Sequence, residues 1–171
     1  MRWLIDGYNL IRRDPDLRDR ETESLEAGRR ALLRLLARAY RDPSDEFTVV
    51  FDGARATGGA PPAGRIRAIF SRPPLTADDE IVRLARQWKS GAVVVSSDRK
   101  IQDAARRSGS AVLTADQFLE GLTFPEDPAA EDFKDRSAPA PDPGRDKRGN
   151  PRRLSKKARR ARRALGRLRQ P

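Results

Sequence analysis

Short runs of apolar residues alternate with longer amphipathic segments along the first 125 residues of the chain. The short runs consist of Val, Ile, Leu and Phe, as in strands that are buried on both faces of a parallel sheet. They predict five strands, over residues 2–5, 47–51, 66–70, 92–95 and 111–113. The amphipathic segments predict helices over residues 25–40, 76–89, 99–107 and 115–122. This alternation predicts a three-layer α/β/α fold with a mostly parallel sheet.

The remaining segments divide the chain into three parts. Residues 1–125 form the predicted domain, interrupted by a Gly- and Pro-rich stretch over 54–64 that we interpret as a mobile surface loop. Residues 126–149 are rich in proline and charge and predict a disordered linker. Residues 150–171 form a basic tail.

The net charge of +11 is concentrated in that tail. Residues 145–171 carry thirteen Lys or Arg and one acid, whereas the preceding 144 residues hold 23 bases and 24 acids. A nearly neutral domain joined to a cationic segment favours a polyanionic partner. Ser155 is a candidate N-cap for a tail helix through residues 156–165. Because bases occupy most of its faces, we expect the tail to be disordered alone and helical on RNA, where it contacts phosphates. A solvated solubility tail and, less favourably, an anchor to acidic membranes are the alternatives.

The composition excludes several kinds of chemistry. The chain contains neither Cys nor His, which removes disulfides, thiolate nucleophiles, imidazole bases and the common zinc sites. It shows no apolar stretch long enough to span a bilayer and no export signal, so the expected location is the cytoplasm. Any catalysis must therefore rely on carboxylates, amides, hydroxyls or cations.

Three predicted strands are followed by aspartate. Asp6 comes directly after the first strand, Asp52 after the second, and Asp98 follows residues 92–97. The carboxyl ends of parallel strands share one edge of the sheet, where open α/β folds bind ligands. Each acid also has a structural interpretation: Asp98 as a helix cap, and Asp6 and Asp52 as turn residues before glycine.

The helix expected from Thr76 contributes a fourth acid. Its apolar stripe over residues 81–88 places Asp78 about 70° from the centre of the buried face and Asp79 about 170° away. Asp78 is therefore directed toward the sheet edge. Asp79 stands three residues after Thr76, as in a capping box.

Carboxylates gathered at one edge repel one another and need a cation or raised pKa values to coexist. Since the chain lacks His and Cys, its oxygen ligands predict a hard ion, Mg²⁺ or Mn²⁺. Such an ion beside a cationic tail indicates hydrolysis of a phosphodiester, in which the metal activates water.

At this point the residues resemble a known family. The segments 4–9, 50–52, 76–81 and 95–98 are similar to the spaced motifs of NYN domains of the YacP type, in the PIN-like nuclease superfamily. The resemblance spans about residues 1–125. It implies a PIN-like fold and a Mg²⁺- or Mn²⁺-dependent endoribonuclease that leaves 5′-phosphate and 3′-hydroxyl ends. It also implies action on mRNA at the ribosome or on another structured RNA.

Carried over residue by residue, the resemblance makes Asp6, Asp78 and Asp98 the metal ligands and Asn9 the amide that orients a phosphate or a metal-bound water. Asp52 and Asp79 are possible accessory acids, although Asp79 departs from the glutamate common at that position. The candidate RNA-binding residues of the tail lie outside the motifs. They are Arg152, Arg153, Lys156, Lys157, Arg159, Arg160, Arg162 and Arg163.

Two other function classes remain open. One is a catalytically inactive RNA- or ribosome-binding module whose carboxylates only cap helices. The other is an aspartyl phosphatase or phosphotransferase, which usually has a second acid two residues after the first, where this chain has Tyr8. Dinucleotide binding is disfavoured because the chain lacks a G-x-G-x-x-G turn.

Overall fold

A sheet of five parallel strands forms the centre of the computed structural model, which describes residues 1–39, 44–53, 64–123 and 156–169. The strands are β1 (Arg2–Asp6), β2 (Glu46–Phe51), β3 (Ile66–Phe70), β4 (Ala92–Val95) and β5 (Ala111–Leu113). Their spatial order is β3-β2-β1-β4-β5. Since β1 pairs with both β2 and β4, the direction of chain progression reverses at the centre of the sheet. Open α/β sheets bind ligands outside the carboxyl ends of the strands at such a reversal.

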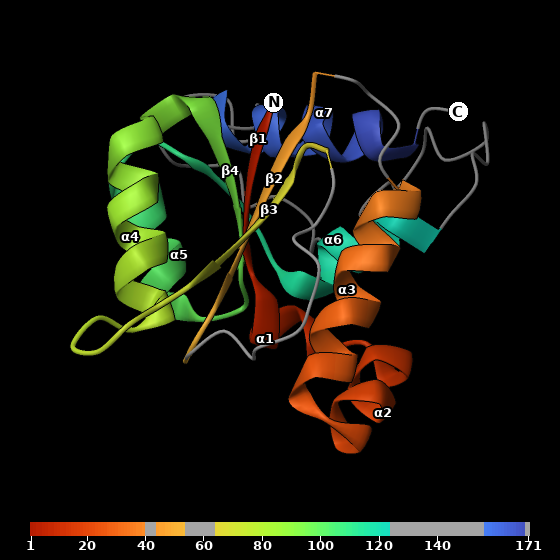
Figure 1. Ribbon diagram of the computed structural model, residues 1–171. Coiled ribbons are helices and arrows are strands. Elements are labelled where there is room, and N and C mark those ends of the chain that lie inside the picture. The colour runs from red at the N-terminus through yellow and green to blue at the C-terminus, as the bar shows by residue number, and fades with distance from the viewer. Residues whose placement is uncertain (40–43, 54–63, 124–155, 170–171) are drawn as a thin grey trace, which may run out of the picture.

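Helices cover both faces of this sheet, which confirms the three-layer α/β/α fold (Figure 1). One face carries α1 (Gly7–Ile11), α3 (Leu25–Ala39) and α6 (Ala115–Thr123), with α2 (Pro15–Glu23) packed on α3. The other face carries α4 (Ala77–Trp88) and α5 (Arg99–Arg107). Alternate residues of β1 enter the two cores: Trp3 and Ile5 face α3 and α6, whereas Leu4 faces α4 and α5.

The helices α3 to α6 lie where the apolar periodicity predicts them, but the sequence interpretation missed α1 and α2. The helix α1 has five residues, too few for an apolar repeat to be visible. The helix α2 buries Leu17 alone, so it carries no apolar stripe either. A local signal for α2 was present, because Asp14 caps the helix and Pro15 occupies its first turn.

The tail differs most from its expected state. Residues 156–169 form α7, and this helix packs against β5 and α6 rather than standing apart from the domain. Ala161 and Ala164 are buried in the core, and Leu165 packs against it. The physical reason is a stripe of small apolar residues three and four positions apart, which lets an arginine-rich helix approach the body closely. The alanines of this stripe can be identified in the sequence, but the many basic residues around them favoured the prediction of an undocked tail.

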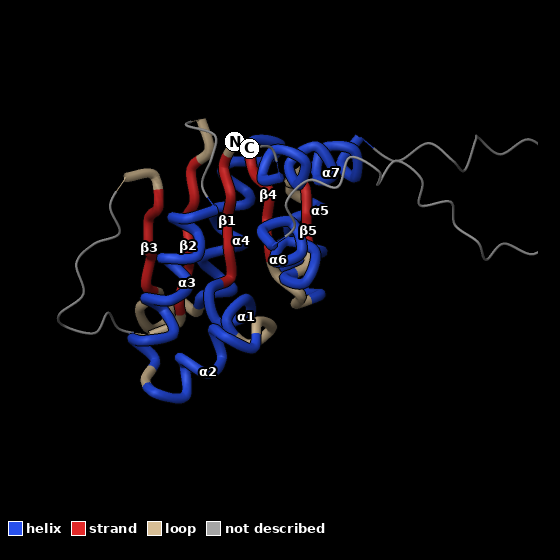
Figure 2. Tube along the Cα trace, turned by 90° about the vertical axis from the view of Figure 1, so that its right-hand side faces the viewer, coloured by secondary structure: helices blue, strands red, loops and turns tan. Residues whose placement is uncertain are grey.

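The helix α7 lies at the opposite end of the sheet from α1, near the amino ends of the strands (Figures 1 and 2). Residues 54–63 of the loop predicted over 54–64, and the whole linker predicted over 126–149, lie outside the described residues. Within the described ranges, no helix combines the length and apolar character needed to cross a bilayer.

Candidate active site

Asp6 lies at the centre of the carboxyl edge of the sheet. It ends β1 and caps α1, since its Oδ1 accepts a hydrogen bond of 3.2 Å from the backbone N–H of Asn9. The Asp6–Gly7 pair is therefore a strand-to-helix junction and not a loop turn. The side chain is partly buried, and burial is the main cause that raises its pKa above the usual range of aspartate. The hydrogen bonds to Asp6 oppose this rise, whereas the negative charges of Asp78 and Asp98 add to it.

Ser96 connects Asp6 to Asp98. This fully buried serine follows β4, and its Oγ donates a hydrogen bond of 2.9 Å to Oδ2 of Asp6. The same Oγ accepts a hydrogen bond of 3.1 Å from the backbone N–H of Asp98. The Ser96 carbonyl is held in turn by Nε2 of Gln102, at 2.8 Å. The hydroxyl thus fixes the relative positions of two candidate ligands from neighbouring strands.

Asp98 caps α5, as its structural interpretation predicts. Its Oδ1 accepts hydrogen bonds from the backbone N–H groups of Lys100, at 2.6 Å, and Ile101, at 3.3 Å. Within the described part of the chain, no hydrogen bond reaches its other oxygen, Oδ2. Capping and ligation are therefore compatible in the same carboxylate.

Asn9 is tied to the loop after β4. Its Oδ1 accepts a hydrogen bond of 2.9 Å from the backbone N–H of Ser97. This contact directs the amide oxygen of Asn9 toward the loop after β4, and Nδ2 makes no hydrogen bond to another described residue. The structure therefore brings Asn9 to the same edge as Asp6 and Asp98.

Asp78 stands in the first turn of α4 and faces the same edge. Partial burial raises its pKa, and the negative charges of Asp98, Asp79 and Asp52 raise it further, while Lys100 lowers it. The pKa of Asp78 is therefore raised by acids that follow both β2 and β4. The four candidate acids Asp6, Asp52, Asp78 and Asp98 are gathered by the fold from separate segments.

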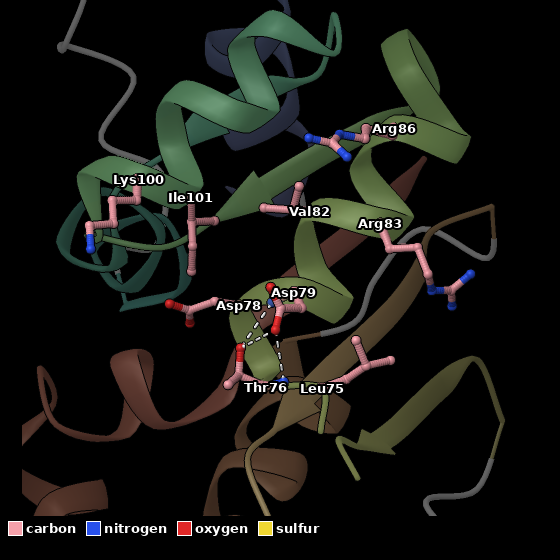
Figure 3. Close-up of a pocket in the computed structure, with 9 residues that line it drawn as sticks. All are labelled: Leu75, Thr76, Asp78, Asp79, Val82, Arg83, Arg86, Lys100 and Ile101. Carbon is pink, nitrogen blue, oxygen red and sulfur yellow. Dashed lines mark hydrogen bonds between the residues drawn. The ribbon is translucent and has the colours of Figure 1, made fainter. Parts of the chain in front are cut away.

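Asp79 has the capping role that its position indicates. Its Oδ2 accepts hydrogen bonds from the backbone N–H of Thr76, at 3.1 Å, and from the Thr76 hydroxyl, at 2.9 Å. The Asp79 N–H donates back to Thr76 Oγ1, which completes a capping box (Figure 3). These bonds lower the pKa of Asp79. Its carboxylate therefore stabilises the start of α4, the helix that presents Asp78.

Asp52 lies at the end of β2 and is held by Ser71. The Ser71 hydroxyl donates a hydrogen bond of 2.6 Å to Asp52 Oδ1 and accepts one of 3.4 Å from the backbone N–H of Gly53. Gly53 has a φ of 91°, in the left-handed region that favours glycine, and the residues that would complete a turn lie outside the described ranges. Asp52 thus directly follows β2 at the edge of the site.

The candidate ligands suit a hard cation, but their arrangement limits how many of the carboxylates can bind the same ion. All candidate ligands are oxygens, the atoms that Mg²⁺ and Mn²⁺ prefer. Among the described residues, however, no three carboxylates converge closely enough to hold one ion together. Mg²⁺ commonly binds through one or two carboxylates and keeps several waters. The arrangement fits that mode and not an all-protein cage.

A buried arginine binds Tyr8 in the helix that follows Asp6. The sequence analysis did not identify this residue. Arg29 of α3 is 6% exposed, and both its Nε and its Nη2 donate to the hydroxyl of Tyr8, with Nε at 2.8 Å. Its guanidinium also lies 5.7 Å from the ring centre of Phe51 and 5.2 Å from that of Phe70. Tyr8 stands where an aspartyl phosphatase would have its second acid, and here it anchors α1.

Gly7 permits this packing. A Cβ at Gly7 would lie 2.3 Å from Cε1 of Phe51, closer than any side chain tolerates. The glycine between Asp6 and Tyr8 is thus required by the Phe51 ring.

The candidate RNA-binding residues of the tail are only partly described. Arg152 and Arg153 precede α7, outside the described residues, and the side chains of Lys156 and Lys157 are not described. On α7 itself, Arg159, Arg162 and Arg163 are exposed and Arg160 is half-buried. These arginines lie on the helix at the far end of the sheet from Asp6 (Figure 1).

Comparison with known proteins agrees with the resemblance noted in the motifs. The family model of the YacP-like NYN domain matches residues 3–162. The chain belongs to the YacP-like NYN domain family. The matched range extends beyond the predicted boundary at residue 125 and includes the first half of α7. This family is one of nuclease-like, RNA-related domains.

A YacP relative supports the assignment. The protein YacP of Bacillus subtilis, itself described as uncharacterized, is 31% identical over 121 residues, which cover 68% of this chain and 71% of the relative. The crystal structure of Rae1 (YacP) from Bacillus subtilis superposes with a TM-score of 0.61 and 29% identity, over 71% of this chain and 73% of that one. A mutant of that protein gives a TM-score of 0.59 and 28% identity, over 71% of this chain and 74% of that one.

Proposed function

We propose that this YacP-like NYN domain protein is a metal-dependent endoribonuclease that hydrolyses phosphodiester bonds in RNA. The observation that carries the proposal is the approach of Asp6, Asp78 and Asp98 from three separate segments to the switch point of a parallel sheet. Burial is the main cause that raises the pKa of Asp6 and of Asp78, and the negative charge of Asp98 raises both further. A cation relieves this repulsion, and membership in a nuclease-like family makes RNA hydrolysis the corresponding reaction.

The proposed cofactor is Mg²⁺ or Mn²⁺, as one or two ions, each bound by one or two of the carboxylates Asp6, Asp78 and Asp98, with water completing the coordination. When bound, the ion activates water and stabilises the charge that develops on the phosphate. Ser96 holds the Asp6 carboxylate in a fixed orientation, and the N-terminus of α5 does the same for Asp98. Asn9 donates from Nδ2 to a phosphate oxygen or to water. Asp52 is an accessory acid, and the expected products carry 5′-phosphate and 3′-hydroxyl ends.

The proposed partners are RNA and the ribosome, with cleavage of mRNA in the cytoplasm. The basic tail supports this proposal, because cations on one helix contact phosphates without reading sequence. Since α7 lies away from Asp6, its arginines are proposed to dock the protein on RNA and not to line the cutting site. The residues concerned are Arg152, Arg153, Lys156, Lys157, Arg159, Arg160, Arg162 and Arg163.

A catalytically inactive RNA- or ribosome-binding module is the second candidate. The observation that favours it is that Asp6, Asp79 and Asp98 all cap helices, which gives each carboxylate a structural reason to be present. Asp78 distinguishes the two candidates, because its carboxylate makes no hydrogen bond to another described residue. In a purely structural site, a carboxylate without hydrogen bonds, whose ionised form is disfavoured by burial and by neighbouring negative charges, has no role.

The test incubates the purified chain with single-stranded and structured RNA in the presence of Mg²⁺, Mn²⁺ or a chelator. We expect cleavage by the wild type only when a divalent ion is present, and loss of cleavage in Asp6→Asn, Asp78→Asn and Asp98→Asn. End-group analysis of the fragments tests the predicted 5′-phosphate and 3′-hydroxyl. RNA binding without cleavage under all these conditions would favour the inactive module instead.

The tail is tested by substituting exposed arginines, since deleting residues 145–171 would also remove the buried Ala161 and Ala164. The variant Arg159→Gln, Arg162→Gln, Arg163→Gln keeps the buried face of α7. We expect it to weaken RNA or ribosome binding and to make that binding less dependent on salt.

A further inference from the structure

A groove between α4 and α5 begins at Asp78 and leads away from the candidate active site. At its lower end, Asp78 and Val82 of α4 face Lys100 and Ile101 of α5 around an open hollow of about 780 Å³ (Figure 3). Arg86 lines this hollow and also the next one, which holds about 420 Å³. The two hollows therefore adjoin at Arg86.

The cations of this groove recur at helical spacing. On α4, Val82 and Arg86 stand at i and i+4, and Lys89 directly follows the last residue of the helix. On α5, Lys100 and Arg107 are seven residues apart, with Ala104 between them. Residues at this spacing share one face of a helix. Both helices start at the edge that carries the candidate site and run toward the other edge (Figure 1), so Lys100 and Arg107 are separated by about 10 Å along α5.

These cations are available for an external partner. Arg86, Lys89, Lys100 and Arg107 form no salt bridge with any other residue in the described ranges. Arg83 provides the contrast, because its Nη2 pairs with Glu80 Oε1 at 2.6 Å. In Figure 3 the Arg83 side chain points away from α5, whereas Arg86 points toward the α5 side.

Lys89 also stands at an unusual place in the backbone. It ends α4 with a φ of 48° and a ψ of −126°, in the left-handed half of φ space that favours glycine. The hydroxyl of Ser110 donates a hydrogen bond of 2.8 Å to the Lys89 carbonyl and holds this conformation. A long cationic side chain therefore occupies a position where glycine would be the relaxed residue.

We propose that the α4–α5 groove binds the sugar–phosphate backbone of one RNA strand flanking the bond that is cut. This inference rests on the proposed function, because it takes the scissile phosphate to lie beside Asp78. Phosphates contact Arg86, Lys89 and Arg107, and riboses lie over the half-buried side chain of Val82 and beside Ala104. No aromatic side chain is among the described residues that line the groove. The strand is therefore held by charge rather than by base stacking, and its sequence is not read.

The test measures RNA binding in an Asp6→Asn background, so that no hydrolysis is needed. The groove variant carries Arg86→Gln, Lys89→Gln and Arg107→Gln. Its matched control carries Arg30→Gln, Arg34→Gln and Arg38→Gln, which remove the same charge from exposed positions of α3 on the other face of the sheet. The probe is a labelled single-stranded RNA of about 15 nucleotides, titrated at several KCl concentrations. Thermal unfolding verifies that both triple variants are folded.

We expect the groove variant to lose about tenfold or more in affinity and about 2 units of slope in log K against log salt, as the loss of three phosphate contacts requires. The control should keep its affinity and its salt slope within about twofold of those of the Asp6→Asn parent protein. The charge-conserving variant Arg86→Lys, Arg107→Lys should keep most of the affinity.

Equal losses in the groove variant and in its control, or no loss in either, would overturn the groove proposal even if the wild type cleaves RNA. A loss of affinity in the α3 control alone would also overturn the groove proposal. Conversely, a selective loss in the groove variant supports the groove even if the wild type never cleaves. If polyglutamate binds the groove and RNA does not, the partner is an acidic protein segment and the proposal is wrong.

Discussion

The hydroxyl of Ser96 donates a hydrogen bond of 2.9 Å to the carboxylate of Asp6, although 90 positions separate the two residues in the sequence. Their strands β4 and β1 are neighbours in the sheet, which is why the contact forms. Because Ser96 is fully buried, its hydroxyl has little freedom to take another partner. The orientation of Asp6 is therefore set by the strand that also delivers Asp98.

Ser96→Ala tests the importance of this orientation. Removing the hydroxyl leaves the Asp6 oxygen and the Asp98 N–H without their partner, so we expect the free energy of unfolding to fall by about 1–3 kcal/mol. Loss of the fixed geometry should lower kcat by about 10- to 100-fold. Urea unfolding and single-turnover RNA cleavage measure the two effects.

Ser97→Ala is the matched control. The Ser97 hydroxyl accepts a hydrogen bond of 3.1 Å from the backbone N–H of Ala115 and so caps α6, away from Asp6. The backbone N–H of Ser97 still reaches Asn9 in this variant. We expect a comparable loss of stability with little loss of cleavage. Equal losses of cleavage in the two variants would mean that Ser96 acts only through stability.

The raised pKa of Asp6 predicts how its contribution to stability changes with pH. Since the folded-state pKa lies above the ordinary value of 3.8, the folded protein binds more protons than the unfolded chain between these two pKa values. The contribution of Asp6 to stability therefore falls as pH rises through that window, and above it the ionised carboxylate is a constant penalty. Asp6→Asn removes the penalty, so its stability relative to wild type should increase with pH and then level off. Thermal unfolding without divalent ions, between about pH 3 and pH 8, measures the difference.

Adding Mg²⁺ or Mn²⁺ near neutral pH provides the second arm of this experiment. An ion held by Asp6 stabilises the folded wild type by mass action and has no such effect on Asp6→Asn. A shift in Tm with Mn²⁺ that is the same in both proteins would argue against ligation by Asp6.

Asp78 and Asp79 are adjacent carboxylates with different environments, and their amides should behave differently. Asp78→Asn removes a candidate ligand, so we expect cleavage to fall by more than about 100-fold, with unchanged or slightly higher stability because its pKa is raised. Asp79→Asn should keep cleavage and lower the Tm, since the ionised carboxylate completes the capping box.

The pH dependence separates the two roles further. The pKa of Asp79 is lowered, so its stabilising effect is present above the unfolded pKa and is lost as pH falls through the folded one. The Tm difference between wild type and Asp79→Asn should therefore shrink in acid. Loss of cleavage in Asp79→Asn, with the helix content of the protein unchanged, would contradict this division of roles.

The sequence predicted the fold well because its strongest signals are periodic. Buried parallel strands are continuous apolar runs, and α4 and α5 carry clear apolar faces. The aspartates could be assigned to one edge because a parallel sheet places the ends of its strands together. What the sequence left open was which strands are neighbours. The pairing of β1 with both β2 and β4 answers this by placing Asp6 at the centre.

The supporting contacts were beyond the reach of the sequence. Nothing in the spacing of Arg29, Tyr8 and Phe51 indicates that they meet, because the contact depends on how α3 crosses the sheet. Ser96 and Ser71 had a weak local signal, as polar residues directly after apolar strands. For α7, the spacing of the alanines indicated an apolar face. The sequence of a helix does not show, however, whether another part of the fold has a surface that this face can pack against.

The docking of α7 leads to a final prediction, on Ala164→Asp. Ala164 is fully buried, so an aspartate there would place an unpaired charge in the core, and the helix must leave the body to hydrate it. The loss of stability should be about 1–3 kcal/mol, limited by the free energy with which α7 docks. Gly166→Asp adds the same charge on the same helix at an exposed position, where a Cβ would have no neighbouring atom within 4 Å, and should have little effect. Urea unfolding and limited proteolysis of the tail measure the difference. If α7 were an independent RNA-binding arm, the two variants would unfold alike, whereas a docked helix makes only Ala164→Asp unstable and its tail susceptible to protease.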